Sequence, residues 1–238
     1  MVSSHLICKY LLDLVYPNRC PICEAFIKWD ELLCESCENS LPFHEKQLCE
    51  KCGKDKCLDH DTLHFDSIHT LMEYEDICIK AIHKLKDDRQ LNFAEYSAKL
   101  LGKMLRENGV AQQADIITAV PMHRSKRRRR GYDQAQKLAH FTAAELGIKE
   151  NYRLLGRTKD TAEQHTLTAA ERKTHAEKIY FSLPDHADIK GKNILLFDDV
   201  YTTGSTLNVC SGLLKEMGAK NVFCAAIATT LLDEKHKE

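Results

Sequence analysis

An apolar run that ends in two adjacent acids places the strongest constraint on how this chain folds. The run covers residues 194–197, which is short enough for a β-strand, and it lacks the polar alternation of a half-exposed strand. Such a strand is predicted to lie in the centre of a parallel sheet, buried on both faces. In open α/β sheets ligands bind beyond the carboxyl ends of the strands, and this strand ends in Asp198 and Asp199. The sequence therefore predicts an α/β fold with a ligand crevice at the two acids.

The residues after the acids form a small-residue turn that opens a predicted helix over residues 207–217. The turn consists of Thr202, Thr203, Gly204, Ser205 and Thr206. Carboxylates accept hydrogen bonds from a sugar diol, and backbone N–H groups at a helix start bind anions. Helix capping alone would explain the hydroxyls but does not require two acids. The motif resembles the phosphoribosyl-pyrophosphate (PRPP) signature of type I phosphoribosyltransferases. The resemblance implies that the acids bind ribose hydroxyls and that the turn wraps the 5-phosphate.

Cysteine is concentrated in the first quarter of the chain, where seven of the eleven cysteines fall between Cys20 and Cys57. Lys9 and Asp13 interrupt the first apolar stretch, so we expect no secretory signal, and no segment approaches a membrane span. We therefore expect a cytoplasmic protein, in which clustered thiols are metal ligands rather than disulfides. The single cysteines are predicted to be core residues: Cys8, Cys78, Cys210 and Cys224.

Two CxxC pairs separated by ten residues predict a structural zinc site. Each pair directs two sulfurs at one ion, so that two pairs complete a tetrahedral shell and leave no position for water. The ligands of this first site are Cys20, Cys23, Cys34 and Cys37. A second set follows with similar spacing: Cys49, Cys52, Cys57 and His60. For the second set three alternatives stay open: His64 replaces His60, the two sets interleave, or only one ion binds.

Charge divides the chain near residue 66. Residues 1–66 hold 7 basic and 12 acidic side chains, a net charge of −5, whereas residues 67–238 carry +4. Seven metal-bound thiolates and two Zn²⁺ ions would take the first part to about −8, because metal-bound thiols are deprotonated. Direct binding of nucleic acid is then expected in the second part only. We predict an N-terminal helix and zinc module over residues 1–66, acting as a scaffold or partner surface, and an α/β domain over residues 67–238.

A basic run follows a second predicted strand, over residues 115–122, and precedes a predicted helix over residues 132–146. Both motif strands are expected to be parallel, so the run and the acid pair should share one edge of the sheet. We expect residues 124–127 to bind pyrophosphate or substrate phosphates and the later arginines to act at longer range; contact with a nucleic-acid backbone stays open. The predicted anion-binding residues are Lys86, Arg124, Lys126, Arg127 and Arg130.

Three further segments are interpreted from their patterns. A strand over residues 70–74 and one helical stretch over residues 77–106 are predicted to open the α/β domain. The polar segment 157–175 predicts either a lid that excludes water from a reactive sugar or an exposed loop entering a helix.

The ordered motifs together resemble the ComF competence proteins, in which a double zinc-ribbon-like module precedes a phosphoribosyltransferase-like domain. That family has a type I phosphoribosyltransferase-like parallel sheet with helices on both faces. The resemblance spans nearly the whole chain, and it rests on the cysteine knuckles and on residues 82–86, 120–123, 130–134, 161–167 with Arg172, and 198–206. The chain departs from the family at Asp133 and His175, where the family usually has Asn.

The resemblance implies a role in natural competence and transformation, in which incoming single-stranded DNA is handled with a competence helicase and a recombination-loading protein. It does not establish a reaction. One hypothesis is a factor that binds PRPP or ribose 5-phosphate with Mg²⁺, carries structural Zn²⁺ and binds single-stranded DNA weakly. The other is an active phosphoribosyltransferase that transfers phosphoribosyl from PRPP to an unidentified acceptor, with pyrophosphate released.

Overall fold

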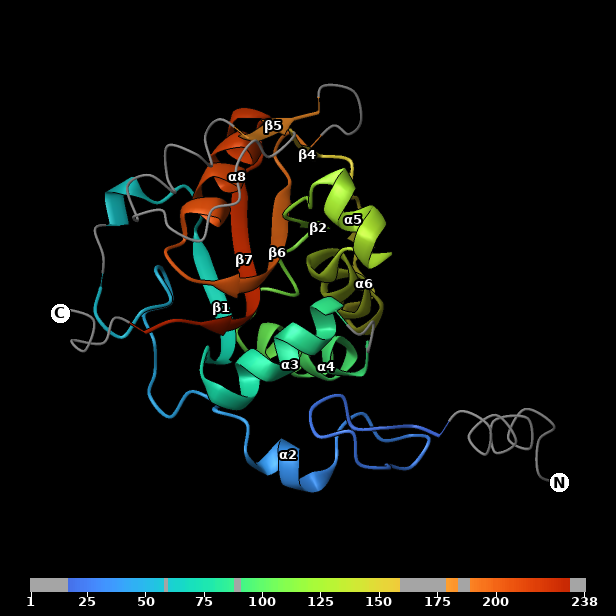
Figure 1. Cartoon of the computed structure of the whole chain (residues 1–238). Coiled ribbons are helices and arrows are strands. Elements are labelled where there is room, and N and C mark those ends of the chain that lie inside the picture. The colour runs from blue at the N-terminus through green and yellow to red at the C-terminus, as the bar shows by residue number, and fades with distance from the viewer. Residues whose placement is uncertain (1–16, 58–59, 88–90, 159–178, 184–188, 232–238) are drawn as a thin grey trace, which may run out of the picture.

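The computed structural model describes residues 17–57, 60–87, 91–158, 179–183 and 189–231. A five-stranded parallel sheet forms its centre, with strand order β1-β7-β6-β2-β3 (Figure 1). The strands of this sheet are β1 (Ser67–Glu73), β2 (Ile116–Ala119), β3 (Lys149–Glu150), β6 (Asn193–Tyr201) and β7 (Asn221–Thr229). A separate antiparallel pair joins β4 (Leu155–Arg157) to β5 (Tyr180–Ser182).

The predicted apolar strand is β6, which lies between β2 and β7 in the sheet. Its successive side chains point to opposite faces, as in any strand. Ile194 and Leu196 pack into one hydrophobic core, and Leu195 and Phe197 pack into the other. All four side chains are fully buried. The prediction of a central parallel strand covered on both faces is confirmed.

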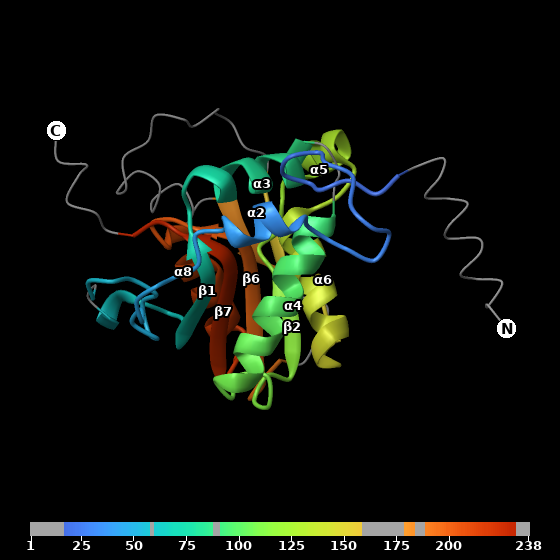
Figure 2. The same cartoon turned by 90° about the horizontal axis from the view of Figure 1, so that it is seen from below.

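Helices cover both faces of the sheet (Figures 1 and 2). The face with Leu195 and Phe197 carries α3 (Asp76–Asp87), α4 (Asn92–Glu107) and α6 (Gln134–Leu146). The opposite face carries α8 (Ser205–Glu216). The remaining elements are short: α2 (Glu35–Asn39), the 3₁₀ turn η1 (His60–Thr62) and α5 (Arg124–Arg130). None of the helices in the described ranges is long and apolar enough to cross a membrane.

The prediction of one helical stretch over residues 77–106 is wrong, because α3 ends at Asp87 and α4 begins at Asn92. A single helix of that length would extend about 45 Å. A nine-residue strand such as β6 extends only about 30 Å, so the sheet face cannot cover such a helix. The break lets both helices bury their apolar sides, with Ile82 and Leu85 on α3 and Leu101 on α4.

The cysteine-rich part packs against the sheet domain at two places. Its first half contributes Cys20, Cys37 and Leu41 to the core that contains Met72 and Cys78. Figure 2 shows this half, with α2, beside α3 and α4. Its second half runs along β1, where the N–H of Ile68 donates to the carbonyl oxygen of Glu50 at 3.0 Å. Cys78, Cys210 and Cys224 are buried as expected.

Several predictions lie outside the described residues. They concern Cys8 and the N-terminal helix, most of the polar segment 157–175, the motif at residues 161–167, Arg172 and His175. The domain boundary near residue 66 stays a prediction.

Candidate functional site

The acid pair lies in the carboxyl-terminal part of β6, beside the last turn of α3. The Nζ atom of Lys86 is 2.8 Å from Oδ2 of Asp199. The Oδ1 atom of Asp198 accepts a hydrogen bond of 2.8 Å from the N–H of Asp199. Both acids line a cavity of about 410 Å³. The predicted site residues that share its wall are Lys86, Lys126, Arg130, Thr202 and Thr206.

Burial and neighbouring charges shift the pKa values of two side chains that line this cavity. Burial and the neighbouring Asp199 charge raise the pKa of Asp198 well above its ordinary value. Burial acts to lower the pKa of Lys86, but the Asp199 charge outweighs it and the pKa is raised. The cavity therefore holds two adjacent carboxyl groups and a charged lysine that pairs with Asp199, an arrangement suited to a ligand that brings both a cation and an anion.

The turn after β6 is shaped by Gly204, which is the N-cap residue of α8 and has φ of +78°. A Cβ atom at this position would lie 2.7 Å from Cε2 of Tyr201. Glycine is thus required by the left-handed conformation and by the ring beneath it. The hydroxyls of Thr203 and Ser205 lie 3.0 Å apart across the turn. Residues 202–206 are called the phosphate loop below.

The basic run forms the helix α5, with His123 as N-cap and Gly131 as a left-handed C-cap. Helical geometry divides its side chains by face rather than by order along the chain. Lys126 and Arg130, four residues apart, line the cavity of the acids. Arg124 and Arg127, three residues apart, line an adjoining cavity of about 960 Å³. We expected residues 124–127 to bind phosphates and the later arginines to act at longer range. The structure instead groups Lys126 with Arg130 at one cavity and Arg124 with Arg127 at the other.

Asp133 connects α6 to the chain that follows β2. Its carboxylate caps α6 by accepting from the N–H of Gln136 at 3.2 Å, and it also accepts from the N–H of Met122 at 2.9 Å. The carboxyl group is buried, and burial raises its pKa. Asp and Asn cap helices about equally well. The departure at Asp133 therefore keeps the capping function that Asn would supply.

Three residues near the site were not identified from the sequence. Arg157 borders both cavities, and Tyr180 lines the smaller one. Lys54 donates to the carbonyl oxygen of Thr202 at the start of the phosphate loop. No local motif marks Lys54, because its partners Thr202 and Thr229 lie 148 and 175 residues away in the sequence.

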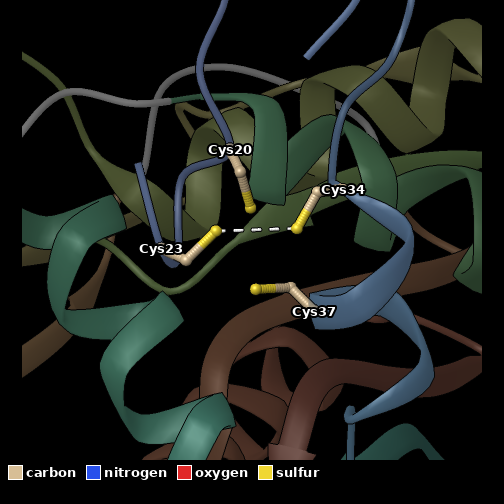
Figure 3. A group of neighbouring side chains, drawn as sticks. All are labelled: Cys20, Cys23, Cys34 and Cys37. Carbon is tan, nitrogen blue, oxygen red and sulfur yellow. Dashed lines mark hydrogen bonds between the residues drawn. The ribbon is translucent and has the colours of Figure 1, made fainter. Parts of the chain in front are cut away.

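The first cysteine set forms a compact cluster whose four sulfurs point toward one another (Figure 3). All its ligand atoms lie within 4.8 Å of one another, and the Sγ atoms of Cys23 and Cys34 are 3.5 Å apart. Zinc–sulfur bonds of about 2.3 Å place tetrahedral sulfurs nearly 4 Å apart, so this cluster fits Zn²⁺. Burial acts to raise the pKa of Cys20, but neighbouring backbone N–H groups lower it to about 7. The thiol of Cys20 therefore ionises more readily than an ordinary cysteine thiol, and zinc binds the ionised form.

The second set also comes together, with Cys49, Cys52, Cys57 and His60 all within 4.8 Å. The Sγ atom of Cys49 is 3.5 Å from Nε2 of His60. His64 lies elsewhere, with its N–H donating to Oδ1 of Asn208 at 2.6 Å. In the structure the two sets are separate clusters, and His60 occupies the fourth corner of the second.

Comparison with known proteins finds a matching domain family for each of the two parts of the molecule. Residues 11–79 match the family model of the double zinc ribbon domain, and residues 108–238 match that of the phosphoribosyl transferase domain. The DNA utilization protein YhgH of Escherichia coli O6:H1 is 29% identical over 229 residues, which cover 94% of this chain and 96% of that protein. Competence protein F of Haemophilus influenzae is 26% identical over 218 residues, 90% of this chain and 92% of the relative.

Among solved structures, a purine phosphoribosyltransferase from Pyrococcus horikoshii is similar with a TM-score of 0.35 and 24% identity. The match covers 57% of this chain and 71% of that one.

Proposed function

The chain belongs to the phosphoribosyl transferase domain family, and from this premise we propose that it binds PRPP or ribose 5-phosphate with Mg²⁺ in the cavity of the acid pair. The observation that carries the proposal is the meeting of Asp198 and Asp199 with Lys86 and with the two ends of the phosphate loop, Thr202 and Thr206, around one cavity. Oxygen ligands, cations and a helix start together match a sugar that carries phosphate and a hard metal ion.

Each part of the site has a distinct task in this proposal. Asp198 and Asp199 accept hydrogen bonds from the ribose hydroxyls. The first turn of α8 and the loop hydroxyls hold the 5-phosphate, since the helix start offers N–H groups. Lys86, Lys126 and Arg130 surround the pyrophosphate. When bound, Mg²⁺ neutralises phosphate charge and orients the pyrophosphate oxygens.

In the cell we propose that this ligand site serves the handling of single-stranded DNA during natural competence. The support is the double zinc ribbon ahead of the phosphoribosyltransferase domain, the arrangement of ComF proteins, together with relatives named competence protein F and DNA utilization protein. A competence helicase and a recombination-loading protein in the cytoplasm are the partners that this role implies. The ligand would then act as a signal that governs docking rather than as a substrate.

Calorimetry with ribose 5-phosphate and Mg²⁺ tests the binding proposal. We expect binding by the wild type and a loss of at least about tenfold in Asp198→Asn and in Asp199→Asn, because each removes a charged acceptor. Glu107→Gln is the matched control, since Glu107 is an exposed acid on α4. Wild-type affinity in both acid variants would reject the assignment.

A specific observation also supports an active transferase as the second candidate. The adjoining cavity of about 960 Å³ shares Pro121, Met122, Asp133 and Arg157 with the cavity of the acids. An acceptor bound there would lie beside a sugar held by Asp198 and Asp199. Transfer would form a bond between C1 of the ribose and the acceptor nucleophile, break the bond from C1 to the pyrophosphate oxygen, and release pyrophosphate.

Release of pyrophosphate from PRPP, measured across a panel of nucleobases and amines, separates the two candidates. Sustained turnover with one acceptor supports the transferase. Binding of PRPP without turnover on any acceptor of the panel supports the binding factor.

A further inference from the structure

A buried lysine connects the second cysteine cluster to the phosphate loop. Lys54 follows the knuckle of Cys49 and Cys52, and it is only 1% exposed. Its ammonium group donates to the carbonyl oxygen of Thr202 at 2.7 Å, to that of Thr230 at 2.6 Å and to Oγ1 of Thr229 at 3.0 Å. An ammonium has three N–H donors, and all three are used here. Lys54 is therefore held in one geometry.

The bond to Thr202 fixes the direction of the first peptide of the phosphate loop. In a trans peptide the C=O and the following N–H point in opposite directions across the plane. Because Lys54 holds the oxygen of Thr202, the N–H of Thr203 points away from the zinc module. The hydroxyl of Thr230 supports the same carbonyl at 3.3 Å. An anion-binding turn works through such fixed N–H directions.

Tyr201 provides a second connection between the same two parts. Its hydroxyl donates to the carbonyl oxygen of Cys52 at 2.7 Å, and its ring centroid lies 4.3 Å from Nζ of Lys54. A Cβ atom at Gly53 would lie 3.3 Å from the ring, and a Cβ atom at Gly204 would lie 2.7 Å from it. The knuckle and the phosphate loop thus approach one aromatic ring through glycines.

Charge explains why a lysine is tolerated at this buried position. A Zn²⁺ ion with three thiolates and a neutral imidazole has a net charge of −1, because bound thiols are deprotonated. A buried ammonium needs such a nearby counter-charge as well as hydrogen-bond acceptors. The metal also fixes the shape of the knuckle that carries Lys54, because structural zinc binding and local folding are coupled.

We propose that Lys54 is a positioning residue for the phosphate loop and couples metal occupancy of the second cysteine cluster to the geometry of residues 202–206. The proposal rests on the proposed ligand function of that loop, and it assigns the second zinc site a regulatory role in addition to a structural one. Loss of the metal loosens Lys54, releases the carbonyl of Thr202 and weakens binding of a phosphorylated sugar.

Hydrogen exchange in the absence of ligand tests the positioning step on the full-length, zinc-loaded protein. Lys54→Met keeps the length of the side chain and removes its donors. We expect exchange of the amides from Thr202 to Asn208, whose N–H bonds to the carbonyl oxygen of Gly204 at 2.8 Å, to become about tenfold faster, as expected when hydrogen bonds from a charged group that hold the loop are lost. Lys56→Met is the control, because Lys56 is an exposed lysine of the same knuckle. Tyr201→Phe is the second variant and should have a smaller effect in the same direction. Unchanged exchange in the loop of both test variants would overturn the proposal.

The mutual effect of zinc binding and ligand binding can be measured directly, and a lysine with only a structural role would not produce it. If metal occupancy favours ligand binding, the ligand must equally favour metal retention. Ribose 5-phosphate with Mg²⁺ should therefore raise the equilibrium concentration of a chelating dye that removes one zinc equivalent from the wild type but not from Lys54→Met. Cys57→Ser should weaken ribose 5-phosphate binding about tenfold. Ligand binding by the wild type without any change in zinc release would reject the coupling. Absence of ligand binding by the wild type would instead reject the proposed function, and hydrogen exchange would then decide the role of Lys54.

Discussion

At the residue scale, the environment of Asp198 opposes folding. Burial and the Asp199 charge raise the pKa of Asp198 above its value in the unfolded chain. The folded state then binds the proton more tightly, so the ionised carboxylate destabilises the fold at pH values above the folded pKa. This penalty decreases as the pH falls through the folded pKa and disappears below the unfolded value of about 3.9.

Asp198→Asn is therefore expected to stabilise the free protein while removing ligand binding. The gain should be about 1 kcal/mol at pH 8, a common size for relief of functional strain, and it should shrink as the pH is lowered toward 4. Thermal unfolding across this pH range measures it. Asp199→Asn is the matched comparison, and it should not stabilise because Asp199 is paired with Lys86 at 2.8 Å. A lower Tm in Asp198→Asn at pH 8 would contradict the argument.

The sequence points to candidate site residues where chemistry and local order coincide. The acids and the small-residue turn were identified because a buried strand followed by this pattern is unusual. The reason for Gly204 was only partly predictable: the sequence places it in a turn expected to bind an anion, whereas the contact with the Tyr201 ring depends on tertiary packing. Lys54 could not be found at all, because its role depends on a contact with Thr202 that only the folded chain creates.

At the scale of elements, α5 shows what helical geometry adds to an interpretation of the basic run from its composition. The sequence placed a basic run at the carboxyl edge of the sheet but did not assign it to a helix. Once the run is helical, Lys126 and Arg130 face the acids, Arg124 and Arg127 face the adjoining cavity, and Arg128 and Arg129 are exposed. Periodicity could not reveal this, because every position of the run is polar and the helix has no buried residue.

Substitutions on the exposed face of α5 and on its cavity face should affect the binding of two different ligands. Neutralising Arg128 and Arg129 to Gln should weaken binding of single-stranded DNA and lower its salt slope by about 0.7 for each lost phosphate contact. Binding of PRPP should not change. Lys126→Gln with Arg130→Gln should mainly weaken binding of PRPP, because these two side chains surround its pyrophosphate in the proposed site. Fluorescence anisotropy with an oligothymidylate over a salt series, together with calorimetry, measures both.

A matched double variant on α4 controls for the loss of two positive charges. Lys99→Gln with Lys103→Gln removes the same charge from an exposed helix face. If this control lowers the salt slope as much as the α5 variant does, the DNA contact is not specific to α5. If the Arg128 and Arg129 variant keeps the wild-type slope, the exposed face of α5 does not contact DNA.

At the scale of the whole molecule, the zinc module is part of the core rather than an appendage. Cys20, Cys37 and Leu41 share a hydrophobic core with β1 and α3. Polar contacts support the same interface: the hydroxyl of Tyr96 on α4 donates to Glu38 at 3.0 Å, and Lys84 on α3 pairs with Glu24. Composition predicted a separate module because residues 1–66 contain many cysteines and an excess of acidic side chains. It could not show that the module packs against α3 and α4 and runs along β1.

Loss of the first zinc ion should therefore destabilise more than the module itself. We expect Cys37→Ser to lose one zinc equivalent and about 3 kcal/mol of stability, because metal loss removes the local fold of a small cysteine-rich segment. For a chain of this length that corresponds to a fall of roughly 6–12 °C in Tm. Hydrogen exchange should increase in residues 18–42 and also in α3, whereas β6 and β7 should keep their protection. Cys78→Ala is the control, since Cys78 is a buried cysteine in the same core that is not part of either cluster. It should retain both zinc equivalents and lose only packing energy. Unchanged exchange in α3 of Cys37→Ser would show that the module unfolds independently of the sheet domain.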